Sequence, residues 1–148
     1  MGKPAKIGTW GGHGGYSQHA RGTPEQLIRI KITVGYHDEC IRSICFYYRA
    51  TDGNMYQEGP WGSSDGVAYE VDLGDWDSLR EISGTTGWSY DSYVVTSLKF
   101  VTDTGTYGPY GNNKRTPFCI TVTNGRIDGF FGRADTLLDA IGVYVNPN

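Results

Sequence analysis

The sequence predicts an all-β domain, built as a sandwich, a barrel or a prism. Three observations support this prediction: short runs in which apolar and polar residues alternate, turn-forming clusters between those runs, and a threefold internal repeat. The chain has 148 residues, so one domain over 1–148 is the expected organisation. A chain of this length can bury a core without disulfides or metal.

The alternation is clearest in LIRIKITV (27–34), GVAYEVDL (66–73) and TPFCITVT (116–123), which have the period of half-buried antiparallel strands. The residues expected to share the buried faces are Ile28, Ile30, Ile32 and Val34, then Val67, Tyr69, Val71 and Leu73, then Phe118, Ile120 and Val122. Clusters such as TDGN, GSSDG and YGNN predict turns between strands. Helix signals are weak: DWDSLREI has room for one or two turns, and 137–145 is predicted to be a turn that feeds a C-terminal strand.

The repeat relates three short segments that share one pattern of aliphatic, variable and small residues. They are IRSICF (41–46), VTSLKF (95–100) and LDAIGV (138–143), and the glycine-rich stretches WGGHGG, WGSSDG and YGPYGN recur at similar intervals. Units of this size cannot each bury a core, so they should pack around one axis. The second position of the pattern is Arg42, Thr96 and Asp139 in turn, so the core does not require a carboxylate there.

Composition excludes several classes of function. The formal net charge is −3 without a basic stripe, so nucleic acid is not an expected partner. No apolar run approaches the roughly 20 residues of a membrane span, and the N-terminus has no apolar signal core. Three cysteines without such a signal predict reduced thiols inside the cell. His37, Cys40 and Cys45 match no standard zinc spacing, so no metal and no cofactor is expected.

Two aspartates in GFFGRADTLLDAIG (129–142) allow three interpretations: one face of a short helix, a catalytic pair, or a clamp for a ligand rich in hydroxyls. A glycosidase would use Asp135 and Asp139 as its two carboxylates. Asp135 is explained well as a turn residue. Asp139 lies between Leu138 and Ala140 at the start of a strand, where a carboxylate needs hydrogen-bond donors such as sugar hydroxyls. WGGHGG predicts either a plain glycine hairpin or a backbone that approaches a ligand closely.

The chain resembles the jacalin-related lectins, of the mannose-binding, single-chain plant type. The resemblance spans nearly the whole chain and is carried by KIGTWGGHGG, IRSICFYY, EISGTTG, VVTSLKFVT, YGPYGNNKRTPF and GFFGRADTLLDAIGVYV in that order. It implies a β-prism of three four-stranded antiparallel Greek-key sheets with pseudo-threefold symmetry. It also implies a non-catalytic, carbohydrate-binding protein.

The family's sugar site joins the N-terminal glycine-rich loop to a G-x-x-x-D segment. By resemblance, Gly15, Thr136 and Leu137 offer backbone N–H groups and Asp139 is the acceptor. Asp135 replaces the motif's glycine, and Asp is among the residues that tolerate left-handed backbone angles. The weaker rim positions are Asp135, Thr85 and Tyr90. Arg42 occupies the matching position of another repeat, so one site of this kind is expected.

The resemblance favours mannose or glucose glycans, because the chain runs without interruption through Gly15. The expected protein is a cytoplasmic or nuclear homodimer related to defence or stress. Two alternatives stay open: a glycoside hydrolase that uses Asp135 and Asp139, and an interaction protein whose sugar site is weakened by Asp135.

Overall fold

The computed structural model describes residues 3–148, and within them the regular structure consists of twelve β-strands and no helix. The strands are β1 (Ala5–Gly11), β2 (Tyr16–Gln18), β3 (Pro24–Val34), β4 (Ile41–Ala50), β5 (Met55–Gly62), β6 (Val67–Asp72), β7 (Leu79–Ser89), β8 (Ser92–Thr102), β9 (Thr106–Gly111), β10 (Thr116–Thr121), β11 (Gly125–Ala134) and β12 (Leu138–Pro147). Neither helix candidate forms: residues 74–76 are a turn before β7, and the predicted C-terminal strand is β12.

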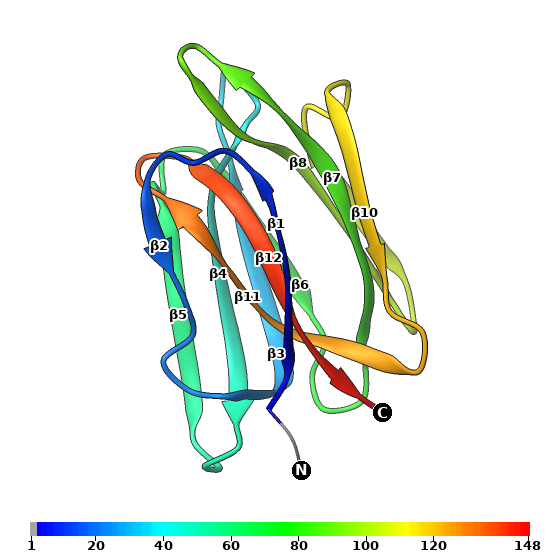
Figure 1. The fold of residues 1–148 in the computed structure, drawn as a ribbon. Coiled ribbons are helices and arrows are strands. Elements are labelled where there is room, and N and C mark those ends of the chain that lie inside the picture. The colour runs from blue at the N-terminus through cyan, green and yellow to red at the C-terminus, as the bar shows by residue number, and fades with distance from the viewer. Residues whose placement is uncertain (1–2) are drawn as a thin grey trace.

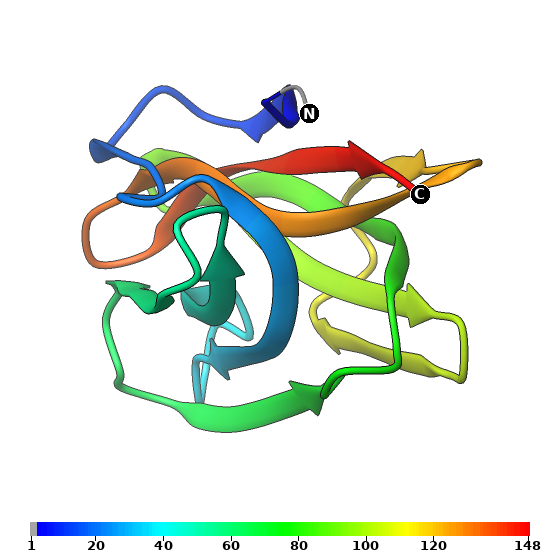
Figure 2. The ribbon, with the colours of Figure 1, turned by 90° about the horizontal axis from the view of Figure 1, so that it is seen from below.

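The strands form three antiparallel units of four, in the orders β5-β4-β3-β6, β9-β8-β7-β10 and β1-β12-β11-β2. In each unit a central hairpin is flanked by two outer strands, which is a Greek key. The third unit is closed by the N-terminal strands, which pair with the C-terminal hairpin. One residue pair, Ile127 with Leu79, links the second and third units into a continuous sheet. Figures 1 and 2 show the units arranged around a common interior, so the predicted β-prism is confirmed.

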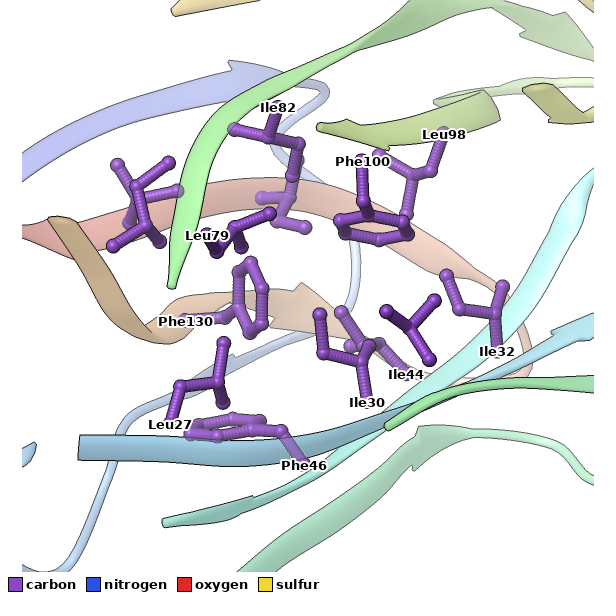
Figure 3. Packing of buried hydrophobic residues seen from close by; sticks show 14 of the residues in the cluster. Leu27, Ile30, Ile32, Ile44, Phe46, Leu79, Ile82, Leu98, Phe100 and Phe130 are labelled. Carbon is purple, nitrogen blue, oxygen red and sulfur yellow. The ribbon is translucent and has the colours of Figure 1, made fainter. Parts of the chain in front are cut away.

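All three units contribute to one core (Figure 3). Phe46 of β4, Phe100 of β8 and Phe130 of β11 are fully buried and come from different units. The ring of Phe130 meets Phe46 edge-on at 5.2 Å and Phe100 at 6.2 Å between centroids. The third repeat ends in Val143 instead of a phenylalanine, and Phe130 of the adjacent strand supplies its aromatic ring. Contacts between these aromatic rings therefore join the three units in the interior of the prism.

The predicted buried faces need two corrections. A bulge in β3 between Leu27 and Arg29 shifts the alternation, so Leu27 is buried and Ile28 only half-buried. On the edge strand β6, Val67 and Tyr69 remain 43% and 40% exposed, because the buried end of that strand begins only at Val71. The other predicted positions either lie in the core or, as on β10, pack against it from the edge.

Candidate functional site

The three units present equivalent structures at the end of the prism where β11 turns into β12. In each unit, one of the two outer strands (β1, β5 or β9) ends in a glycine with positive φ, and a side chain there would collide with a carbonyl group of the neighbouring strand. The following amide donates to that same carbonyl. These bonds join Gly12 to Asp139 at 2.9 Å, Ser63 to Arg42 at 3.1 Å, and Asn112 to Thr96 at 2.9 Å. The structure thus confirms that Asp139, Arg42 and Thr96 are equivalent positions.

Asp139 turns its carboxylate toward the glycine-rich loop. Cβ atoms built at Gly14 and Gly15 would lie 2.9 Å from Oδ2 and 2.6 Å from Oδ1 of Asp139. Gly15 also has a φ of 69°, which a residue with a side chain rarely adopts. Because they have no side chain, Gly14 and Gly15 allow the backbone of this loop to approach the carboxylate closely.

The carboxylate of Asp139 is buried but incompletely satisfied. The residue is 6% exposed, and Oδ1 accepts no hydrogen bond from the described residues. Burial raises the pKa of this carboxyl group, and the negative charge of Asp135 raises it further. The charge of Arg133 and the N–H of Asp135 act in the opposite direction. An ionised acceptor in this position gains from a ligand that brings hydrogen-bond donors.

Arg133 fixes the loop beside Asp139. Its Nε donates to the carbonyl of Gly14 and one Nη to the carbonyl of Gly15, both at 2.9 Å. Strand β2 extends this attachment by pairing Tyr16 with Ala134. Sequence reasoning missed Arg133, because nothing in a strand's period shows that its side chain reaches a loop some 120 positions away.

Backbone donors lie on the two loops that flank the carboxylate. Within residues 3–148, the N–H groups of Gly15, Thr136 and Leu137 donate to no other group. Asp135 is exposed, and its N–H donates to the carbonyl of Leu137 at 3.1 Å. The φ of Asp135 is not positive, so the turn does not require the glycine of the family's motif. The region therefore offers one charged acceptor and several free donors.

A pocket of about 490 Å³ opens between the glycine-rich loop and the β7–β8 hairpin. Its walls are Gly11, Gly12, His13 and Gly14 on one side, Trp88, Asp91, Ser92 and Tyr93 on the other, with Asp139 between them. The rings of Trp88 and Tyr93 meet edge-on at 5.4 Å. Sequence reasoning did not select this aromatic wall, although exposed aromatic residues beside a turn are a usable signal for a ligand site.

The remaining rim expectations have different outcomes. Tyr90 lies at the tip of the β7–β8 hairpin, next to the pocket wall, and is 94% exposed. Thr85 does not lie at the rim, which corrects that expectation. It is 4% exposed, and its hydroxyl is engaged with Thr96 at 2.6 Å, Ser97 at 2.7 Å and the carbonyl of Asn112 at 2.8 Å. Thr85 therefore stabilises the equivalent corner of the second unit.

The other two units do not repeat the acceptor. Arg42 carries a guanidinium that donates to Asp38 at 2.8 Å, and Thr96 is bonded to Thr85. Among residues 3–148, no group of three or more His, Cys, Asp or Glu side chains is arranged to hold a metal ion. None of the described residues forms a helix that could cross a membrane.

Comparison with known proteins agrees with this geometry. The family model described as the jacalin-like lectin domain matches residues 7–144. Horcolin of Hordeum vulgare is 38% identical over 149 residues, which cover 99% of this chain and 100% of horcolin. A mannose/glucose-specific lectin of Parkia platycephala is 37% identical over 123 residues, which cover 80% of this chain and 27% of that protein. The solved structure of a mannose-binding jacalin-related lectin from Ananas comosus has a TM-score of 0.92 and 35% identity, with 99% of this chain and 100% of that chain covered. The chain therefore belongs to the jacalin-like lectin domain family.

Proposed function

We propose that this lectin binds mannose- or glucose-containing glycans at Asp139. The observation that carries the proposal is a buried carboxylate with an unused oxygen, held against a glycine loop and beside free backbone amides. Two adjacent sugar hydroxyls can donate to the carboxylate, while their oxygens accept from the N–H groups of Gly15, Thr136 and Leu137. The names of the relatives from Parkia platycephala and Ananas comosus support the choice of sugar.

The pocket walls support binding of more than one sugar unit. Its volume of about 490 Å³ extends from Asp139 to the β7–β8 hairpin. Trp88 is 60% exposed there and offers an apolar ring against which the C–H face of a second unit can stack. A glycan that spans both surfaces should bind more tightly than the monosaccharide.

Neither alternative function gains support. The matching family and its relatives are lectins, which bind carbohydrates without catalysis, so hydrolysis by Asp135 and Asp139 is not proposed. The second alternative, an interaction protein with a weakened sugar site, depended on Asp135 standing in the place of the motif's glycine. The φ of Asp135 is not positive, so this turn does not depend on the backbone freedom of glycine.

Assembly and cellular role are part of the proposal. A shallow monosaccharide site has an expected dissociation constant of about 1 mM, so recognition of a glycosylated surface needs several linked sites. We propose a homodimer formed through exposed sheet surfaces, a cytoplasmic or nuclear location, and a role in defence or stress. Three cysteines that remain free thiols in the structure support the intracellular location.

A glycan array with the purified protein tests the sugar assignment. The expected result is signal on mannose- and glucose-terminated glycans, competed by free methyl α-mannoside. Selective signal on galactose-terminated glycans, or signal that methyl α-mannoside leaves unchanged, would contradict the proposal.

A further inference from the structure

A second pocket lies at the opposite end of the prism from Asp139. It has a volume of about 340 Å³ and forms where the β6–β7 turn meets the first residues of β3 and β11. In Figure 1 this turn lies at the lower end, near the C-terminus, whereas the β11–β12 loop lies at the upper end. The two pockets therefore have no wall in common, and their occupants would be far apart.

Trp76 lines this second pocket and is 81% exposed. Its ring rests on Gly74, where a built Cβ would be 3.2 Å from the six-membered ring. Trp10, Trp61 and Trp88 each pack against another aromatic ring, but Trp76 has no such neighbour within residues 3–148. A tryptophan left open in this way beside a pocket is available to a ligand.

Three of the four carboxylates that line the pocket, those of Asp75, Asp77 and Asp128, have partners within the protein. Arg126 pairs with Asp128 at 2.9 Å, and Arg49 lies 3.6 Å from Asp75. Asp77 is buried and accepts from the hydroxyl of Thr104 and from the amide of Ser78. Asp75 and Asp128 thus each lie beside a guanidinium, and neutral donors satisfy Asp77.

Other polar groups of the pocket are free. The carboxylate of Glu25 and the hydroxyl of Ser78 form no hydrogen bond or ion pair with residues 3–148. The amide of Gln26 is engaged at both ends, since its Nε2 donates to the carbonyl of Asp75 at 3.4 Å and its Oε1 accepts from Arg49. The free carboxylate and the free hydroxyl complement the donors and acceptors of a polyol. Together with an open indole ring, they complement the two kinds of surface that a pyranose presents.

We infer that the Trp76 pocket is a second carbohydrate-binding site, for neutral glycans. The C–H face of a pyranose stacks on the indole ring, and its hydroxyls donate to Glu25 and Asp75. This assignment rests on the residues of the pocket itself and not on Asp139. Sites at opposite ends give one chain two points of attachment, so a monomer would be able to cross-link glycans.

The test uses the indole N–H resonances of the ¹⁵N-labelled Asp139→Ala protein, titrated separately with mannotriose, cellotriose and chitotriose. The expected result is a saturable shift of the Trp76 resonance with at least one trisaccharide, in the millimolar range. The same titration of Trp76→Phe should keep a saturable response at Ser78, whereas Trp76→Ala should weaken it about tenfold or more. Because Trp76 is exposed, neither change should unfold the protein.

Three outcomes would overturn the inference. One is an unshifted Trp76 resonance with all three sugars at about 20 mM, well above the expected dissociation constant. Another is an unchanged response in Trp76→Ala. The third is a shift with arginine methyl ester but with none of the sugars, which would indicate a basic partner instead. In the protein that keeps Asp139, a sugar bound beside Asp139 shifts the Trp88 resonance and a sugar in the second pocket shifts the Trp76 resonance, so failure at either site can be told apart from failure at the other.

Discussion

Replacing Asp139 by alanine removes the carboxylate that lies against Gly14 and Gly15 of the glycine-rich loop. Hydrogen bonds to a charged group contribute about 1.5–3 kcal/mol each, so loss of an acceptor shared by two hydroxyls should cost about 2–4 kcal/mol. That is about a 30- to 1000-fold loss of affinity. Starting from a dissociation constant of about 1 mM, the binding heat should disappear from a calorimetric titration with methyl α-mannoside.

The same substitution should leave the fold intact. Oδ1 of Asp139 is buried and has no hydrogen-bond partner among residues 3–148, so its removal relieves a desolvation cost. The thermal midpoint should therefore stay the same or rise. Arg42→Ala is the matched control, because Arg42 occupies the same position in another unit and should keep full binding. An Asp139→Ala protein that folds normally and still binds with unchanged heat would refute the assignment of the acceptor.

Three further predictions concern the surroundings of Asp139. Acidification should abolish sugar binding, with a midpoint at a pH above 3.8, the ordinary pKa of an aspartate. Burial and the charge of Asp135 raise the pKa of the Asp139 carboxyl, and only its ionised form accepts two hydroxyls. Calorimetry from pH 7 to pH 4 measures this, and a constant affinity would contradict it. Asp135→Gly should bind equally well or modestly better and keep binding to lower pH, since it removes a charge that raises that pKa; if binding collapses, Asp135 is itself a ligand. Arg133→Ala should weaken sugar binding by about 1–2 kcal/mol, because the glycine-rich loop loses two hydrogen bonds, to the carbonyls of Gly14 and Gly15. An unchanged affinity would show that the loop keeps its place without Arg133.

As the pH rises, ionisation of Asp139 should lower the stability of the fold while it strengthens sugar binding. A carboxyl whose pKa is raised on folding binds its proton more tightly in the folded state, so it costs no stability below its unfolded pKa. Its cost develops as the pH rises from about 3.8 through the folded pKa. Sugar binding, by contrast, develops over the same rise in pH.

Local period and repetition made most of the fold predictable. The alternation in β3 and β10 and the threefold recurrence of one strand pattern led to sheets around an axis, which the structure contains. The assignments that failed depend on features that no local pattern shows. Ile28 loses its place in the core to a bulge, and Val67 lies at the exposed end of an edge strand.

The site was predictable where one repeat departs from the others. Asp139 stands where the equivalent residues are Arg42 and Thr96, so its carboxylate serves no shared packing role. Arg133 and Trp88 could not be assigned in this way, because their roles arise from contacts between segments far apart in the chain. Thr85 was misplaced for the same reason, since its partners lie on β8 and in the residue after β9.

A crystal structure of the protein with methyl α-mannoside tests the central claim most directly. The account predicts a sugar in the pocket beside Asp139, with two adjacent hydroxyls on its carboxylate and the amides of Gly15, Thr136 and Leu137 within hydrogen-bond distance of the sugar oxygens. A sugar bound at the equivalent position of another unit, beside Arg42 or Thr96, with the Asp139 carboxylate left without a ligand, would contradict it.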